Sequence, residues 1–199
     1  GRRCGSFGDI ACTSFFPSKP LGCYGDGGAV LVDSDEVSAL IASLKVHGKG
    51  SSKYDNVRIG MNSRLDTVQA AVLLAKMDLL DEEMEKRQQV AARYRDAFDG
   101  KIQTPKITED SVSSFAQFVL MAESQDQRDA IVAAMKAVGV PSLIYYPRPL
   151  HQMKAFGEST ESFPNAERYA RCNFGIPFSP YITEEEQDQV ISTVLSVLR

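Results

Sequence analysis

Lys19 is the residue whose type and setting are best suited to chemistry, because it lies between Pro17 and Pro20. Each proline fixes its own φ, so the backbone that carries the amine has little freedom. Apolar runs flank this segment at residues 10–16 and 29–32, and both are typical of short buried strands. A lysine held beside buried sheet can be desolvated and become a nucleophile for Schiff-base chemistry. The alternative, a solvated loop lysine, is favoured by local sequence alone, since lysine side chains are almost always exposed.

The elements that must position Lys19 begin with the strands at 10–16 and 29–32. Ser34 is expected to cap a short helix that packs one face on the sheet. Residues 46–61 are polar and without period, which predicts a long loop. A helical tract follows, with a break or bend expected at 78–83 and an end at Gly100. One side of the tract carries an apolar stripe that we expect in the core or in a helix interface: Leu65, Val68, Val72, Ala75 and Leu79.

The second half of the chain again alternates strands with helices. After a polar crossover at 101–113, we expect strands at 115–122 and 142–146, with a helix capped by Asp126 between them. A short helix at 163–173 and an extended segment at 175–180 come next. Thr183 and Glu186 form the sequence pattern of a capping box that opens a last helix. Such alternation favours an α/β architecture.

Composition excludes several classes of function. The 199 residues carry a net charge of −4, which gives no reason to expect a nucleic acid or an anionic membrane as partner. No apolar run approaches the roughly 20 residues of a membrane-spanning helix, and the first residues lack a signal-peptide core. Four cysteines at unrelated spacings and two histidines predict neither a disulfide framework nor a metal site, so we expect a cytoplasmic protein.

Several motifs occur together and in a fixed order along the chain. They are Ser14-Phe15-x-x-x-Lys19, Gly25-Asp26-Gly27-Gly28, Asn62-Ser63-Arg64-Leu65-Asp66-x-x-Gln69-Ala70-Ala71, Tyr145-Tyr146-Pro147-x-Pro149-Leu150-His151 and Phe163-Pro164-x-Ala166-Glu167. Jointly they resemble the DegT/DnrJ/EryC1/StrS family of sugar-nucleotide aminotransferases, which use pyridoxal 5′-phosphate (PLP) on the fold-type-I scaffold. The resemblance covers essentially the whole chain. It favours the reactive lysine over the solvated one.

The resemblance implies roles for three residues around the cofactor. Lys19 matches the lysine that binds PLP covalently and then acts as general base. Ser14 matches the serine whose hydroxyl binds the cofactor phosphate. Asn62 matches an asparagine that reaches the phosphate of the neighbouring subunit's cofactor, which implies a homodimer with shared active sites.

It also implies a substrate side of the site. Arg64 is a candidate for binding a phosphate or carboxylate, although an ion pair at a helix start is an equal alternative. Tyr145, Tyr146 and His151 match a segment near the sugar nucleotide, and His151 could equally be a loop histidine with a backbone partner. His47 matches a mobile region near the partner's site. The segment at 51–60 is most similar to that of family members acting on UDP-linked N-acetylated keto-sugars. Glutamate is the expected amino-acid donor. Whether the sugar is aminated at C3 or C4 stays open.

In this family roughly half the protein precedes the lysine, so the chain resembles a C-terminal half. We expect residues 1–63 to end the PLP-binding large domain, 64–100 to form linking helices, and 101–199 to form a small α/β C-terminal domain. The acid that pairs with the pyridine nitrogen and the aromatic that stacks on the ring are not assigned here. We therefore expect little or no transaminase activity from this piece alone, with an inactive remnant as the alternative function. Dehydratase relatives carry histidine in place of the lysine, so Lys19 argues against that branch.

Overall fold

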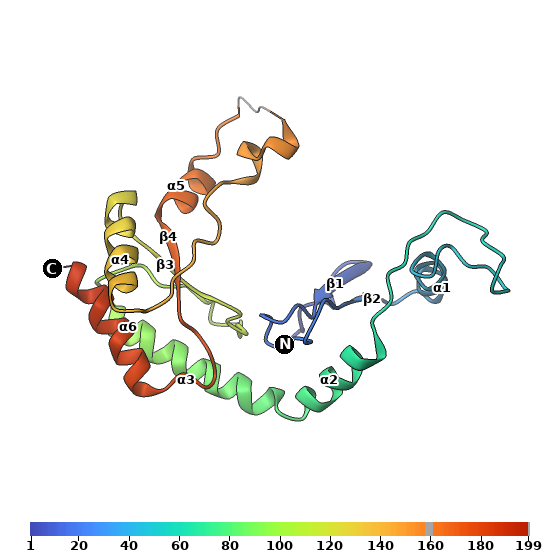
Figure 1. Cartoon of the computed structure of the whole chain (residues 1–199), viewed down its shortest axis with the longest axis horizontal. Helices are drawn as coiled ribbons and strands as arrows, with labels where there is room; N and C mark the ends of the chain where they lie inside the picture. The colour runs from blue at the N-terminus through green and yellow to red at the C-terminus, as the bar shows by residue number, and fades with distance from the viewer. Residues whose placement is uncertain (158–160, 199) are drawn as a thin grey trace. The chain divides into compact units, whose positions relative to one another are not determined.

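The computed structural model describes residues 1–157 and 161–198, which group into two compact units, 1–81 and 82–199. Both contain helices and strands, in agreement with the expected α/β class (Figure 1). The assignment of segments 1–63, 64–100 and 101–199 to parts of a larger enzyme stays a prediction. Within the described residues, no helix combines the length and apolar character needed to cross a membrane.

Unit 1 contains an antiparallel pair of strands, β1 (Ile10–Ser14) and β2 (Gly28–Val32), in register from Ile10↔Val32 to Ser14↔Gly28. The expected strand at 10–16 is two residues too long, because the Phe16 amide turns back to donate to Ser14 Oγ at 3.2 Å. The expectation that these strands are buried is wrong for this chain: Ile10 is 54% exposed. In the described residues β1 and β2 pair only with each other, so neither outer edge of the pair has a strand partner.

Helix α1 (Asp35–Leu44) begins as predicted, with Ser34 Oγ accepting from the Val37 amide at 3.3 Å. The loop at 46–61 is also confirmed, and two isolated bridges close it, Val46↔Asn62 and Lys49↔Asn56. Helices α2 (Thr67–Met77) and α3 (Leu80–Phe98) are separated at Asp78 and Leu79, inside the expected break.

The face that α2 buries differs from the one predicted. Leu73 is its only buried residue, whereas Val68 is 71% exposed and Leu79 is 49% exposed. Core packing of the predicted stripe is therefore wrong for these residues of this chain. The inward face instead carries Gln69, Leu73 and Lys76, which are spaced by four and then three residues and therefore share one side of a helix.

Unit 2 is built on α3 and on a second antiparallel pair, β3 (Phe118–Met121) and β4 (Asn173–Ile176). The unit also contains α4 (Gln125–Ala137), η1 (Leu150–Gln152), η2 (Lys154–Phe156), α5 (Pro164–Cys172) and α6 (Glu184–Val197). The strand pair and helices α3, α4 and α6 contribute the fully buried side chains of the core, which include Tyr94, Phe98, Phe118, Leu120, Ile131, Met135, Phe174, Val190 and Val194.

Three boundaries in unit 2 correct the sequence-based expectations. Strand β3 starts only at Phe118, because Phe115 has a φ of 43° that interrupts extended backbone. The N-cap of α4 is Ser124, whose hydroxyl accepts from the Gln127 amide at 3.2 Å, and not Asp126. The strand expected at 142–146 is reduced to one bridge between Leu143 and Gly175.

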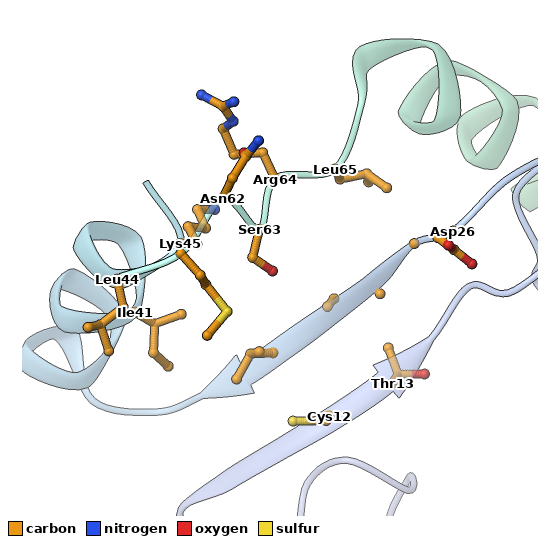
Figure 2. Close-up of a pocket in the computed structure, with 15 residues that line it drawn as sticks. Cys12, Thr13, Asp26, Ile41, Leu44, Lys45, Asn62, Ser63, Arg64 and Leu65 are labelled. Atoms are coloured by element: carbon orange, nitrogen blue, oxygen red, sulfur yellow. The ribbon is translucent and has the colours of Figure 1, made fainter. Parts of the chain in front are cut away.

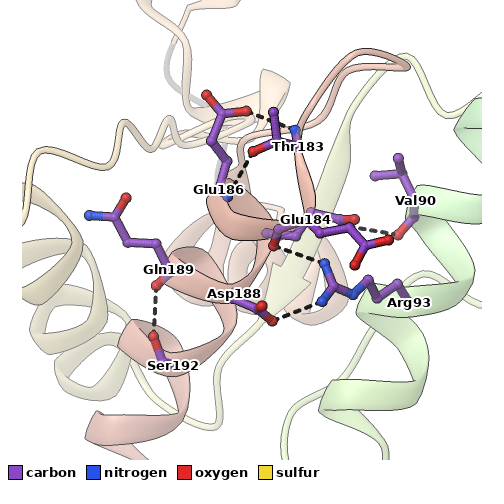
Figure 3. A network of polar contacts seen from close by, with 9 residues as sticks. Val90, Arg93, Thr183, Glu184, Glu186, Asp188, Gln189 and Ser192 are labelled. Carbon is purple, nitrogen blue, oxygen red and sulfur yellow. Dashed lines mark hydrogen bonds and ion pairs between the residues drawn. The ribbon is translucent and has the colours of Figure 1, made fainter.

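The capping box of α6 is confirmed. Thr183 Oγ1 accepts from the Glu186 amide at 3.1 Å, and Glu186 Oε2 accepts from the Thr183 amide at 2.9 Å (Figure 3). Arg93 of α3 donates to the Glu184 carbonyl and to Asp188 Oδ1, both at 2.9 Å. These bonds fix the first turn of α6 against α3, so the last helix closes the core of unit 2.

Candidate active site

Lys19 lies in a closed loop, residues 15–24, which we call the lysine loop. The Phe15 amide donates to the Gly27 carbonyl at 2.8 Å, and the Cys23 amide donates to the Phe15 carbonyl at 2.7 Å. Lys19 itself donates its amide to the Phe16 carbonyl at 2.8 Å. The start of the loop is therefore fixed next to the strand pair, the end of the loop is bonded back to its start, and Lys19 lies near its middle.

Two glycines permit this closure. A Cβ at Gly22 would lie 2.7 Å from the Pro17 carbonyl oxygen and 2.8 Å from that of Phe16. A Cβ at Gly27 would lie 2.7 Å from Cys23 Sγ, which is buried. Contacts this short, with backbone at Gly22 and with a buried side chain at Gly27, leave no room for a Cβ. The glycines after Lys19 therefore let the loop fold back on its own start.

The amine of Lys19 and the hydroxyl of Ser14 are both unengaged as donors. In the part of the chain that the structure describes, Lys19 Nζ has no ion pair or hydrogen bond, and its side chain is half-buried. Ser14 Oγ accepts from the Phe16 amide, so its O–H remains to donate to a ligand at the end of β1. A primary amine on a closed loop, with a hydroxyl donor directly before that loop, fits a cofactor that carries both an aldehyde and a phosphate. These residues therefore fit PLP.

Helix α2 holds the far end of the lysine loop. Gln69 Oε1 accepts from the Tyr24 amide at 2.9 Å, and Lys76 Nζ donates to the Gly22 carbonyl at 2.8 Å. The Lys76 ammonium also lies 5.8 Å from the centre of the Tyr24 ring. Sequence reasoning used Gln69 only as part of a motif and missed Lys76. Their seven-residue spacing, two helical turns on one face, was the available signal.

Asn62 and Arg64 line a cavity of about 900 Å³ in unit 1 (Figure 2). Strands β1 and β2, the end of α1 and the segment 61–65 surround it. Asn62 is fixed there by its bridge to Val46, and the next amide, of Ser63, donates to the Lys45 carbonyl at 2.9 Å. Ser14 and Lys19 are not among the residues that line this cavity.

His47 lies at the base of the 46–61 loop with a φ of 59°. Its amide donates to the Met61 carbonyl at 2.9 Å, and its carbonyl accepts from Asn56 Nδ2 at 2.8 Å. The exposed ring is thus carried by a backbone that is held on both sides. The structure does not bring His47 into the cavity with Asn62.

Tyr145, Tyr146 and His151 come together in unit 2, where they line a cavity of about 680 Å³ that we call the tyrosine groove. The rest of its lining is mostly apolar: Arg148, Pro149, Leu150, Met153, Phe163, Ala166, Tyr169 and Ala170. Aromatic rings beside hydrogen-bonding tips suit a flat heterocycle with polar edges.

Within the tyrosine groove, His151 Nε2 lies 3.3 Å from Glu167 Oε1, and the imidazole packs 4.8 Å from the Phe163 ring centre. Glu167 Oε1 also accepts from the Phe163 amide at 3.0 Å. That backbone bond, followed by the bonds from His151 and Ser162, holds the pKa of Glu167 below its ordinary value of 4.5. His151 therefore has a side-chain partner and not the backbone partner considered from sequence.

Asn173 is a residue that sequence reasoning missed. Its fully buried side chain accepts from the Tyr145 amide at 2.7 Å and donates to the Tyr169 carbonyl at 2.7 Å. It also approaches the Tyr146 carbonyl at 3.4 Å. One amide group thus bonds to the backbone of three tyrosines that line the tyrosine groove.

None of the groups of histidine, cysteine and acid side chains in residues 1–157 and 161–198 is arranged to hold a metal ion. All four cysteines are free thiols.

Comparison with known proteins assigns the family. The sequence pattern of the DegT/DnrJ/EryC1/StrS aminotransferase family matches residues 1–195. A chain matched over nearly its whole length belongs to that family, so the resemblance drawn from the motifs is confirmed.

Individual relatives agree with this assignment. A UDP-2-acetamido-2-deoxy-3-oxo-D-glucuronate aminotransferase of Pseudomonas aeruginosa is 40% identical over 92% of this chain and 50% of its own length. The crystal structure of a DegT DnrJ EryC1 StrS aminotransferase from Brucella abortus matches with a TM-score of 0.90 and 42% identity, covering 97% of this chain and 52% of that one. NtdA from Bacillus subtilis, solved with bound cofactor PMP, matches with a TM-score of 0.88 and 27% identity, covering 98% and 47%.

The chain spans about half the length of the curated relatives it matches. The expected fold, part of a PLP aminotransferase, is confirmed by the structural matches. The cofactor class is likewise confirmed for the family, because PMP and PLP are the amino and aldehyde forms of one cofactor.

Proposed function

We propose that this chain provides the lysine-bearing part of a PLP-dependent aminotransferase that acts on a nucleotide-linked keto-sugar. The observation that carries the proposal is Lys19, whose unengaged amine is carried by a closed loop that begins directly after Ser14 at the end of β1. Relatives named as aminotransferases support it and do not favour the inactive-remnant alternative.

Each residue at the proposed site has a specific role. Lys19 Nζ would hold the cofactor and would accept and return the proton moved during amino transfer. Ser14 Oγ would donate to the cofactor phosphate. PLP itself supplies the electron sink for the reaction. Asn62 would reach the cofactor phosphate of a partner subunit, in a homodimer with shared sites. Its place in a cavity without Lys19 is consistent with that role.

The proposed substrate is a UDP-linked, N-acetylated 3-keto-sugar with glutamate as amino donor. The name of the Pseudomonas aeruginosa relative, which specifies a UDP-linked 2-acetamido-3-oxo sugar acid, supports this class. Tyr145, Tyr146 and His151 in the tyrosine groove would contact the sugar nucleotide. Arg64 would bind a phosphate or carboxylate group, and His47 would lie near the partner's site.

Borohydride reduction with PLP, followed by peptide mapping of the full gene product, tests the central assignment. We expect a phosphopyridoxyl adduct on Lys19, loss of the adduct in Lys19→Arg, and its retention in Lys45→Arg. An adduct on any other lysine would overturn the proposal.

Substrate class is tested separately by kinetics on the full gene product. UDP-linked 3-keto-sugars should be aminated with higher kcat/KM than dTDP-linked analogues or 4-keto isomers. A reversed preference would refute the proposed substrate and leave the assignment of Lys19 intact.

A further inference from the structure

The lysine loop is held from one side by β1 and from the other by α2. At its start, Ser14 pairs with Gly28 in the strand register, and the Phe15 amide donates to the Gly27 carbonyl. At its end, the carbonyl of Gly22 and the amide of Tyr24 have no strand partner. They bond to the side chains of Lys76 and Gln69.

Both bonds require close packing of a polar side chain of α2 against the backbone of residues 22–25. The Lys76 ammonium, part-buried, meets a carbonyl oxygen instead of a carboxylate, and its bond is charge-assisted. A Cβ at Gly25 would lie only 3.2 Å from Gln69 Nε2, so the chain passes directly against the glutamine amide. The inward face of α2 therefore carries two part-buried polar side chains, on either side of the buried Leu73, that bond to the lysine loop.

We propose that Gln69 and Lys76 are positioning residues for Lys19: they fix the far end of the lysine loop so that the amine keeps one place relative to Ser14. The inference rests on the proposed role of Lys19 as the cofactor attachment site. It adds a second element, α2, to the machinery that orients the lysine. The side chains act on backbone and need no contact with the cofactor.

Amide hydrogen exchange of Tyr24 in the full gene product measures the contact directly. Gln69→Leu removes the acceptor, and we expect Tyr24 exchange to accelerate by about two- to tenfold, the equivalent of one net hydrogen bond. Gln69→Glu keeps an oxygen at the same place and should exchange at the wild-type rate. Equal exchange in wild type and Gln69→Leu would overturn the proposal.

The pH dependence of the PLP absorbance band reports the placement of Lys19. In Lys76→Met, which keeps the apolar stem, and in Gln69→Leu, we expect the band's pH midpoint to shift from the wild-type value. Lys76→Arg and Gln69→Glu, which keep the donor and the acceptor, should restore it. A midpoint that does not move in Lys76→Met or Gln69→Leu would contradict the proposal.

Thr183→Ala is the matched control, because it removes a capping bond in unit 2 and lowers stability without touching the lysine loop. It should leave both Tyr24 exchange and the pH midpoint unchanged. Equal effects in Thr183→Ala would show that general destabilisation, and not positioning, is at work.

Borohydride labelling of wild-type Lys19 separates the two proposals. Without a Lys19 adduct the proposed function fails and the positioning role falls with it, whereas an adduct with unmoved midpoints overturns the positioning role alone.

Discussion

Asn173 shows how a single buried side chain can order a site that it does not line. It lies at the start of β4, yet its amide oxygen and nitrogen are used by the backbone of Tyr145, Tyr146 and Tyr169. No sequence motif singles out Asn173, because an asparagine next to a helix end is typical of an ordinary helix cap. Its importance follows from burial together with the number of backbone groups it satisfies.

Asn173→Ala should therefore destabilise unit 2 by about 2–3 kcal/mol, because buried backbone groups lose their partners. Urea denaturation followed by circular dichroism measures the change. The exposed neighbour Asn165→Ala is the control, with an expected effect within about 0.5 kcal/mol. Similar losses in both variants would contradict the assigned role of Asn173.

Glu167 predicts a pH dependence in the tyrosine groove. Its pKa is lowered in the folded state by the Phe163 amide first, then by His151 and Ser162. A depressed carboxyl pKa stabilises the fold above the ordinary value of 4.5, and that contribution is lost as pH falls through the lower folded value. The melting temperature of the wild type should be higher than that of Glu167→Gln at pH 7, and this difference in melting temperature should shrink below pH 4.5. A difference that is constant with pH would refute this linkage.

Helix caps were the part of the fold that sequence predicted best, because capping is local. Ser34 and the pair Thr183 and Glu186 form the expected bonds. The error at Asp126 has a local cause too. Ser124 lies two residues earlier in extended backbone with a φ of −139° and ψ of 166°, which is the geometry of an N-cap, whereas Asp126 is already helical.

This distinction is testable by paired substitutions at the start of α4. Ser124→Ala should cost about 1 kcal/mol of unfolding free energy through loss of the cap. Asp126→Ala removes only a favourable charge in the first turn and should cost about 0.3–0.5 kcal/mol. Thermal or urea unfolding of both variants provides the measurement. A larger loss in Asp126→Ala would restore the sequence-based assignment.

The burial of β1, β2 and α2 could not be predicted from periodicity. Apolar runs at 10–16 and 29–32 are typical of strands inside a larger sheet, and they form strands here, but with Ile10 and Leu31 exposed at 54% and 44%. In α2 the polar side chains of Gln69 and Lys76 face inward because both bond to the backbone of the lysine loop. Gln69 accepts from the Tyr24 amide, and Lys76 donates to the Gly22 carbonyl. Hydrophobic periodicity carries no information on such tertiary polar contacts.

At the scale of the whole molecule, the family was predictable and the arrangement of the site was not. Ordered motifs around Lys19, Asn62 and His151 were enough to predict the family, because each motif records a local requirement for a particular residue type. Within unit 1, Lys19 lies on the lysine loop and Asn62 lines a cavity whose lining does not include Lys19, whereas His151 lines the tyrosine groove of unit 2. Motifs give the order of these residues along the chain but not the cavities that they line.

The 199-residue chain alone should accordingly show little or no transaminase turnover. No acid within it is assigned to the pyridine nitrogen, so the electron sink would be weakened, and in the described residues β1 and β2 pair only with each other. The measurement is amine formation from a UDP-linked keto-sugar and glutamate, with the chain alone and with the full gene product. Lys19→Arg in the full product controls for uncatalysed amination. Normal turnover together with a PLP absorbance band from the 199 residues alone would refute the expectation, since the chain would then hold every group that the reaction requires.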